Sequence, residues 1–368
     1  MTRQLVTIRQ VTEVAPIEGA DFIELAKVDG WQCIVKKGDF EVGFFGVYHE
    51  IDSLLPLSNP AYAFLQRSGA TKTHHRLKTI KMKGTLSQGL LLPLNADGLE
   101  VARSWFTNGP ETEVPDLAAE MGVTLYEPEI HGVGGATGVC LRTFPGFLPR
   151  TDLERCQNIK RDIELTIANN IGSPEPETFE VQTKYDGTSL TAYCRPDVFV
   201  CAYEMSEIGV CSRNQQLKDD GANMYWRGAL DAGWLYALPI IAEACGGTVA
   251  IQGELMGPGI QSNRMKLIAK QAFAFDIFSV KHARYLTRTE RDLMWDLVEF
   301  KSGVRIVEVD TMAACWALTP LSDILIDFMA HCEKLVGYPL EGLVYKSNRP
   351  GGLRFKAISN SYLLKFGE

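Results

Sequence analysis

The sequence predicts an α+β protein built from two parts, a small N-terminal β-barrel and a larger domain of strands and helices. With 368 residues, 46% of them hydrophobic, the chain can bury two cores of ordinary domain size. Its N-terminal quarter consists of short β-rich runs separated by glycines, whereas from residue 151 onward β-like runs are mixed with helical stretches.

The N-terminal part, residues 1–95, has the spacing of a small barrel. Strands are expected at 5–8, 23–25, 33–35, 44–48 and 90–92. Turn signals separate these runs, namely the glycines at positions 19, 30, 38, 43 and 89. Several short strands at this spacing are typical of closed barrels, and the oligonucleotide-binding (OB) barrel is one option. A barrel by itself does not establish a function.

Residues 96–150 lose the periodicity and gain glycine and proline. They include Gly-Val-Gly-Gly at 132–135 and Phe-Pro-Gly-Phe-Leu-Pro at 144–149. Such composition is typical of connecting segments, so we expect this stretch to be a linker or extension between the two domains.

Residues 151–368 are expected to form one α+β domain. Its β-like runs lie at 180–183, 190–193, 249–254, 272–277 and 343–346. Thr287 and Glu290 fit a capping box, which predicts a helix over about 288–300. A second helix is expected over about 321–336, ending at Gly337.

Composition excludes several classes of protein. No run of 18 apolar residues occurs and no apolar segment follows the first residues, so we expect no membrane span and a cytoplasmic or otherwise intracellular location. Nine cysteines without a C-x-x-C pair argue against a disulfide framework and a zinc ribbon. The net charge of −8 disfavours a nucleic-acid partner unless a local basic patch holds it.

One such patch is the segment 66–83, which contains no acidic residue. Its candidate nucleic-acid contacts are Lys72, Arg76, Lys78, Lys81 and Lys83. A charge run of this kind is often no more than a solvated loop or strand face. The segment alone therefore leaves both interpretations open.

The candidate chemistry centres on Lys184, in the sequence Glu-Val-Gln-Thr-Lys-Tyr-Asp-Gly-Thr-Ser-Leu at 180–190. A lone Lys-x-Asp-Gly often marks only a β-turn. Here an ordered series follows it: Cys-Ser-Arg-Asn at 211–214, Ile-Gln-Gly-Glu-Leu at 251–255, Phe-Ala-Phe-Asp-Ile-Phe at 273–278, Glu-Gly-Leu-Val-Tyr-Lys at 341–346 and Arg-Phe-Lys at 354–356. Chance does not readily produce five further elements in this order.

This series resembles the six motifs of the covalent nucleotidyltransferase superfamily, which includes polynucleotide ligases and mRNA capping enzymes. The stretches 17–56, 144–158 and 358–365 are similar to ATP-dependent RNA ligases of the Deinococcus and Naegleria type, which carry an N-terminal OB domain. The resemblance therefore spans nearly the whole chain. It implies an OB-like nucleic-acid-binding domain followed by an ATP-grasp-like ligase domain of antiparallel sheets flanked by helices.

The resemblance implies that Lys184 is the catalytic nucleophile, which attacks the α-phosphorus of ATP. The amine must be neutral to attack, so its pKa of about 10.4 has to be lowered or its proton removed. Asp186 would face the ribose or a metal-bound water, and Gly187 would let the backbone approach the nucleotide. Arg213 would bind a phosphate as a planar bidentate donor.

The later motifs imply further roles. Glu254 would accept hydrogen bonds from ribose hydroxyls, and Glu341, together with Asp186, would bind Mg²⁺ or Mn²⁺. Lys346 and Lys356 would contact the α-phosphate and help to expel pyrophosphate.

Two further positions remain open in the pattern. Phe273 and Phe275 share one face of a strand, so either could stack on adenine while the other packs in the core; the family pattern implies one such aromatic, and between two nearly equal candidates we choose Phe273. The last motif is usually Lys-x-Lys in the family, whereas this chain has Arg354, which leaves the role of that residue open.

The implied activity joins a 3′-hydroxyl end to a 5′-phosphate end through lysyl-AMP and adenylylated-polynucleotide intermediates, as in RNA repair at nicks. The expected partner is RNA with a nick or broken ends, RNA/DNA hybrids included, and the expected oligomeric state is a monomer. DNA ligases and capping enzymes share the central motifs but usually place the OB domain after the catalytic domain. A nucleic-acid-binding protein with an inactive transferase domain is the alternative from another class.

Overall fold

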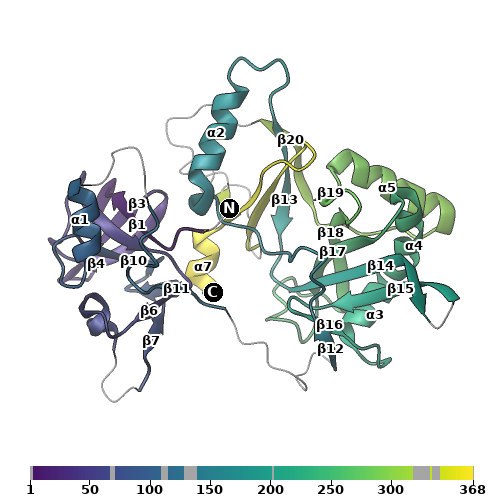
Figure 1. The fold of residues 1–368 in the computed structure, drawn as a ribbon, viewed down its shortest axis with the longest axis horizontal. Coiled ribbons are helices and arrows are strands. Elements are labelled where there is room, and N and C mark those ends of the chain that lie inside the picture. The colour runs from purple at the N-terminus through teal and green to yellow at the C-terminus, as the bar shows by residue number, and fades with distance from the viewer. Residues whose placement is uncertain are drawn as a thin grey trace.

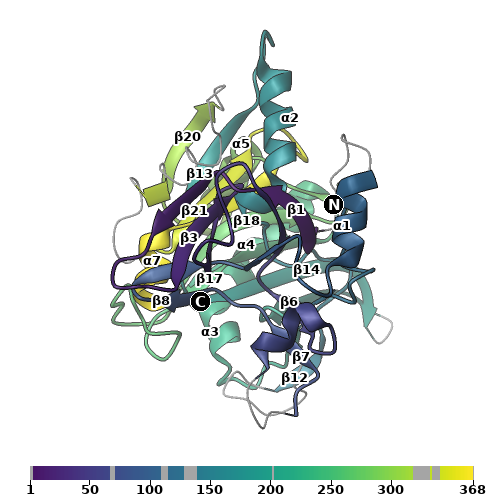
Figure 2. The same cartoon turned by 90° about the vertical axis from the view of Figure 1, so that its left-hand side faces the viewer.

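A computed structural model describes the chain over residues 3–66, 71–108, 115–127, 139–200, 203–317, 332–333 and 340–367. Figure 1 shows a small N-terminal domain and a larger domain beside it, with the C-terminal helix between the two. In Figure 2 the small domain is turned toward the viewer, so that strands near the N-terminus lie in front of the larger domain.

The N-terminal domain is built from short antiparallel strands, and every strand expected there from the sequence is present. Its elements are β1 (Val6–Gln10), β2 (Glu13–Pro16), β3 (Ile23–Val28), β4 (Trp31–Lys36), β5 (Phe45–His49), β6 (Ser53–Pro56), the 3-10 helix η1 (Pro60–Leu65), β7 (His74–Arg76), β8 (Ile80–Met82), β9 (Thr85–Ser87) and β10 (Leu90–Pro93). They pair as β1-β5-β10, β2-β3-β4 and β8-β9, while β6 pairs with β7. Trp31 and Tyr48 are fully buried in the core that these sheets enclose.

The stretch 96–150 contributes to both domains instead of only connecting them. Helix α1 (Glu100–Asn108) and strand β11 (Thr124–Leu125) belong to the N-terminal domain, because Ala102 and Met121 are buried in its core and β11 pairs with β6. Strand β12 (Cys140–Thr143) instead pairs with a strand of the larger domain. The high glycine and proline content of the stretch predicted a linker, although apolar residues within it pack in the core of the N-terminal domain.

The larger domain contains two antiparallel sheets and the helices that cover them. Its elements are η2 (Cys156–Ile159), α2 (Lys160–Asn170), β13 (Thr178–Lys184), β14 (Thr188–Val200), β15 (Tyr203–Cys211), β16 (Gln215–Leu217), α3 (Met224–Asp231), α4 (Trp234–Cys245), β17 (Val249–Met256), β18 (Gln271–Ser279), β19 (Arg284–Tyr285), α5 (Arg288–Ser302), β20 (Thr311–Ala317), β21 (Gly342–Ser347), β22 (Arg354–Ile358) and α7 (Asn360–Phe366). One sheet has the order β12-β16-β15-β14-β17-β18-β19, the other β20-β13-β21-β22.

Apolar side chains fix each helix to its sheet. Helices α3, α4 and α5 share the large core with β14, β17 and β18, around the fully buried Trp234. Helix α2 places Ile163 and Ile167 against the four-stranded sheet. The predicted capping box of α5 is present, because Thr287 accepts from the backbone of Glu290 and Glu290 accepts from that of Thr287. The helix expected over 321–336 lies almost entirely outside the described residues.

The chain passes from one sheet to the other directly after Lys184. This residue ends β13 in the four-stranded sheet, and β14 begins in the seven-stranded sheet only four residues later. The Lys-Tyr-Asp-Gly turn therefore lies at the junction of the two sheets, where strands of both converge.

The two domains contact each other through α7 and its surroundings. Lys81 on β8 donates to the carbonyl oxygen of Leu364 at 3.0 Å, and Leu86 packs with Leu363 of the helix. Lys160 of α2 also pairs with Asp29 of the barrel at 2.9 Å. No helix in the described parts of the chain has both the length and the apolar character needed to span a membrane.

Candidate active site

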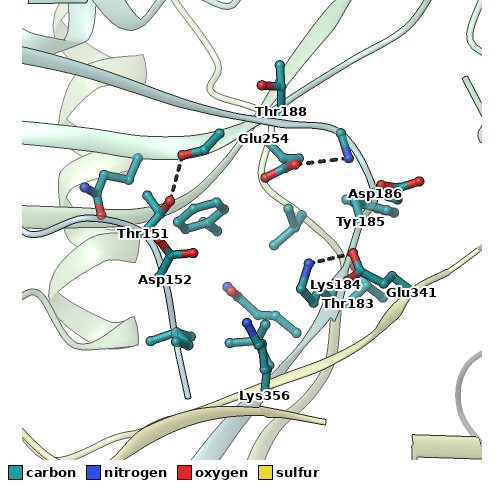
Figure 3. A pocket seen from close by; sticks show the side chains of 18 of the residues that line it. Thr151, Asp152, Thr183, Lys184, Tyr185, Asp186, Thr188, Glu254, Glu341 and Lys356 are labelled. Carbon is teal, nitrogen blue, oxygen red and sulfur yellow. Dashed lines mark hydrogen bonds and ion pairs between the residues drawn. The ribbon is translucent and has the colours of Figure 1, made fainter. Parts of the chain in front are cut away.

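A cavity of about 660 Å³ lies where the two sheets meet, and Figure 3 shows the side chains that line it. Residues of β13, β14, β17, β18, β21, β22 and α7 contribute to its wall. Among the predicted site residues, the following line it: Lys184, Asp186, Gly187, Arg213, Glu254, Phe275, Glu341, Lys346 and Lys356. The structure therefore gathers motifs that are up to 172 residues apart in sequence, from position 184 to position 356.

Lys184 is held by an ion pair with Glu341. Its Nζ atom lies 2.6 Å from Glu341 Oε2, and the Glu341 amide donates to the Lys184 carbonyl oxygen at 3.0 Å. Burial acts to lower the pKa of the Lys184 amine, but the charges of Glu341 and Glu254 outweigh it and raise the pKa. Beside these two carboxylates the lysine is thus a cation, whereas its attack requires a neutral amine. Removing the proton must therefore accompany the reaction.

A glycine follows Glu341 because the next strand approaches there. A Cβ atom at Gly342 would lie 2.1 Å from the Ala357 carbonyl oxygen, so a larger residue would push β21 away from β22. The Glu-Gly pair of this motif thus combines a carboxylate in the cavity with the close strand pairing that positions it.

Glu254 lines the cavity above Lys184 and Glu341 in the view of Figure 3, and it accepts a hydrogen bond from the Gly187 amide at 3.0 Å. Burial raises the pKa of its carboxyl group to about 7 despite the nearby Lys184 cation. A Cβ atom at Gly187 would lie 2.6 Å from the Leu255 carbonyl oxygen, which explains the glycine in Lys-x-Asp-Gly. The contact fixes the turn after the lysine to β17.

Asp186 points toward the end of the chain. Its Oδ2 atom accepts from the Tyr362 hydroxyl of α7 at 2.7 Å, and it forms an ion pair with Arg264. Neither partner was among the residues predicted from sequence, because they lie 78 and 176 positions away from Asp186.

Two further lysines provide positive charge in the cavity. Lys346 is buried and donates to Asp276 Oδ1 at 3.0 Å and to the Phe275 carbonyl oxygen at 2.6 Å. Burial lowers the pKa of Lys346 to about 8. Burial, together with the neighbouring cation of Lys184, likewise lowers the pKa of Lys356 to about 8.

Arg354, whose role the sequence left open, binds the same carboxylate as Lys346 and so helps to hold that carboxylate in place. It forms an ion pair with Asp276, the same carboxylate that holds Lys346, and its guanidinium lies 4.0 Å from the Tyr285 ring centroid. A planar cation stacked on a ring suits this place better than a flexible ammonium.

Of the two candidate phenylalanines, Phe275 lines the cavity. Phe273 packs against Tyr185 with ring centroids 5.6 Å apart. The structure thus places Phe275 rather than Phe273 at the cavity, and adenine stacking by either residue stays a prediction. Both residues share a strand face, and only the shape of the cavity distinguishes them.

Arg213 lies at the rim of the cavity and is mostly exposed. It pairs with Asp152 at 2.7 Å.

Gln182 was not among the residues predicted from the motifs, yet it lines the cavity from β13. Its side chain is buried, and its Oε1 atom has no hydrogen-bond partner among the described residues. The two-residue period of a strand could have indicated Gln182, since it shares the face of Lys184.

The basic segment lies outside the cavity. Arg76 is already paired with Asp52 at 2.6 Å and stacks on Tyr126, and Lys81 binds the backbone of α7. Lys72, Lys78 and Lys83 are exposed. Two of the five predicted contacts thus have protein partners, Arg76 and the exposed Lys81, and the other three are exposed lysines.

The described residues contain no group of three or more His, Cys, Asp or Glu that could hold a metal by themselves. Mg²⁺ in nucleotide sites is usually held by one or two carboxylates together with phosphates and water. Glu341 fits that description, because its carboxylate faces the cavity beside three lysines. Asp186 fits less well, since two protein groups already occupy it.

We expect the reaction with ATP to slow above pH 8. In the role that the motifs imply, Lys346 and Lys356 act on phosphate charge only as cations, and with pKa values of about 8 each falls from about 90% protonated at pH 7 to about 10% at pH 9. kcat/KM for ATP, which reports the free enzyme, should drop at least about tenfold over this range.

These two lysines do not make the folded state less stable at high pH. Their folded-state pKa values lie below the unfolded value of 10.5, so deprotonation between about pH 8 and 10.5 favours folding. Circular dichroism at each pH separates loss of activity from loss of structure. A kcat/KM that stays flat up to about pH 9.5 would contradict the prediction.

A small barrel followed by a larger domain with a lysine in the cavity between its two antiparallel sheets is the architecture of polynucleotide ligases. A family model described as RNA ligase matches residues 177–358, and a model of an OB-fold domain matches residues 5–94. A search of curated proteins gave no match. Several solved structures are similar over the whole chain.

Three of these similar structures are mutants of the Naegleria gruberi RNA ligase, each 33% identical to this chain. The apo form covers 99% of this chain and 98% of its own, with a TM-score of 0.74. A form with AMP and Mn covers 99% of both chains with a TM-score of 0.73, and one with ATP and Mn covers 98% of both with 0.72. The chain belongs to the RNA ligase family.

Proposed function

We propose that the protein is an ATP-dependent RNA ligase that seals a 3′-hydroxyl end to a 5′-phosphate end, with Lys184 as the adenylated residue. The observation that carries this proposal is the cavity in which Lys184 meets Glu341, Glu254, Lys346 and Lys356. A nucleophilic amine, two carboxylates and two further amines are the groups that nucleotidyl transfer needs. The ATP and Mn of the Naegleria complexes support the same two cofactors here.

In the first step, the Lys184 nitrogen attacks the α-phosphorus of ATP and the bond to pyrophosphate breaks. The attacking amine has to lose its proton, and Glu341 Oε2 at 2.6 Å is in position to accept it. A divalent metal, when bound at Glu341, supplies positive charge that stabilises the transferred phosphate. Lys346 and Lys356 stabilise the same charge, and Glu254 binds the ribose.

In the second and third steps, AMP passes from the lysine to the 5′-phosphate, and the 3′-hydroxyl then displaces it. Both steps transfer a phosphoryl or nucleotidyl group, so the same cations serve each of them. We propose nicks or breaks in RNA, including RNA paired with DNA, as substrates in repair inside the cell. A monomer suffices, since all the proposed site residues come from one chain.

Lys72, Lys78 and Lys83 are the proposed RNA contacts on the barrel. They are exposed and carry charge that the acidic remainder of the chain does not supply. Phosphate contacts of this kind position a nucleic acid without reading its sequence. Arg76 and Lys81 have protein partners and contribute less directly in this proposal.

Base selection is proposed to depend on Gln182. Its buried Oε1 atom lacks a partner among the described residues and can accept a hydrogen bond from the amino group of adenine. Guanine presents a carbonyl oxygen at the equivalent position, which would leave two acceptors facing each other. ATP should therefore be preferred to GTP.

The test is to incubate the protein with α-labelled ATP or GTP and Mg²⁺ or Mn²⁺, and to measure label that survives denaturation. We expect label from ATP but not from GTP, and sealing of a nicked RNA duplex when unlabelled ATP is added. Label from GTP alone would indicate a capping-type enzyme, and sealing of DNA nicks only would indicate a DNA ligase. No label with either nucleotide would favour a nucleic-acid-binding protein with an inactive transferase domain.

A further inference from the structure

Asp186 is held from two directions by side chains outside the motifs of this site. Arg264 forms an ion pair with it, and the Tyr362 hydroxyl donates to its Oδ2 atom at 2.7 Å. Asp186 and Arg264 each keep only 17% of their side-chain surface exposed, and both line the cavity with Tyr362. The carboxylate two residues after the nucleophile is therefore fixed by groups from the loop before β18 and from α7.

The loop that carries Arg264 is built to hold a defined shape. Gln261, Asn263 and Lys266 have φ angles of 46°, 42° and 53°, in the left-handed region that residues other than glycine rarely adopt. The Asn263 side chain closes the loop by donating to the Leu267 carbonyl oxygen and accepting from the Leu267 amide. Gln261 also donates to the Gly187 carbonyl oxygen at 3.2 Å. Such conformations persist only where surrounding contacts enforce them, and they are common at functional sites.

Helix α7 completes the arrangement. The Arg264 guanidinium lies 4.4 Å from the ring centroid of Phe366 and 5.4 Å from that of Tyr362. Stacking of this kind fixes the plane of the guanidinium without neutralising its charge. On its other side the helix is held by the barrel, through Lys81 and the Leu86–Leu363 contact.

We propose that Arg264 is a positioning residue for Asp186 in the adenylation of Lys184, with Tyr362 as the second anchor. Without them the carboxylate would be free to rotate in a cavity that already contains Glu254 and Glu341, and its repulsion from them would no longer be offset. With them it faces the nucleotide in one orientation. The proposal rests on the proposed function, because it assigns a role within the transfer of AMP to Lys184.

The test measures the rate of protein labelling by α-labelled ATP over a range of ATP concentrations. Arg264→Ala should lower kcat for labelling about tenfold or more, the usual effect of losing a hydrogen-bonded partner of a charged group. Arg264→Lys keeps the charge but not the planar fork and should recover only part of the rate. Tyr362→Phe, which removes a single oxygen, should lower kcat about threefold to tenfold.

The matched control is Lys270→Ala, which removes one exposed positive charge near the end of the same loop without contacting Asp186. It should label at the wild-type rate. The decisive comparison places Arg264→Ala in an Asp186→Ala background: if Arg264 acts through Asp186, the second substitution should have no further effect on kcat. A merely structural loss of loop stability would slow both backgrounds equally.

Two outcomes would overturn the inference: full labelling by Arg264→Ala and Tyr362→Phe, or equal slowing in the two backgrounds. If Arg264→Ala does not fold, Tyr362→Phe alone tests the proposal. Failure of the proposed function gives a different result, namely no label on the wild-type protein itself.

Discussion

Lys184→Ala is expected to abolish formation of the covalent adenylate, with a loss of at least about 10³-fold in labelling from ATP. Lys346 is not placed to take over, since it is held by Asp276 and by the Phe275 carbonyl oxygen, away from the Glu341 carboxylate that orients Lys184. The measurement is label retained on denatured protein after incubation with α-labelled ATP and metal.

A substrate that bypasses the first step provides the internal control for this variant. A nicked RNA whose 5′ end already carries AMP needs only the attack of the 3′-hydroxyl, so Lys184→Ala should still seal it to a measurable extent. Lys218→Ala, which removes an exposed lysine outside the cavity, should label normally. Labelling of Lys184→Ala at a rate near that of the wild type would show that another residue is the nucleophile.

Arg291→Met should reduce the free energy of unfolding by about 3–5 kcal/mol, as removing one partner of a buried ion pair typically does. Arg291 on α5 keeps only 2% of its side chain exposed and lies 2.7 Å from Glu180 and 2.6 Å from Glu308. Methionine fills similar space, so the cost arises from the Glu180 carboxylate, which is left buried on the strand that carries Lys184. Denaturant unfolding followed by circular dichroism measures the change.

Arg288→Met is the matched control, because it makes the same chemical change one helical turn earlier. Arg288 keeps 31% of its side chain exposed and lies 3.8 Å from Glu180, so its loss should cost less than about 1 kcal/mol. Equal destabilisation by the two substitutions would contradict the assignment of the energy to burial. An Arg291→Met variant with an unchanged free energy of unfolding would also contradict it.

Local sequence features predicted much of the fold. Alternation of apolar residues located the strands of both domains, since side chains of a strand point alternately to its two faces. The capping box at Thr287 and Glu290 located the start of α5, because it satisfies backbone donors within the same turn. Features that a short segment satisfies by itself can be predicted from that segment.

The motif series likewise predicted nine of the residues that line the cavity, Lys184 among them. It could not predict that Glu341 is the residue in direct contact, nor that this contact raises the pKa of the lysine. A pKa depends on burial and on charges brought from distant strands, which spacing along the chain does not express.

The sequence alone determined the class of chemistry, because the residue types and their order limit what the site can do. Only the tertiary structure showed that Phe275 rather than Phe273 lines the cavity, divided the stretch 96–150 between two domains, and gave Arg76 and Lys81 of segment 66–83 protein partners. It also brought Arg264 and Tyr362 to Asp186. Each of these depends on which surfaces meet when the two sheets and the barrel pack, and long-range packing of that kind leaves no local pattern in the chain.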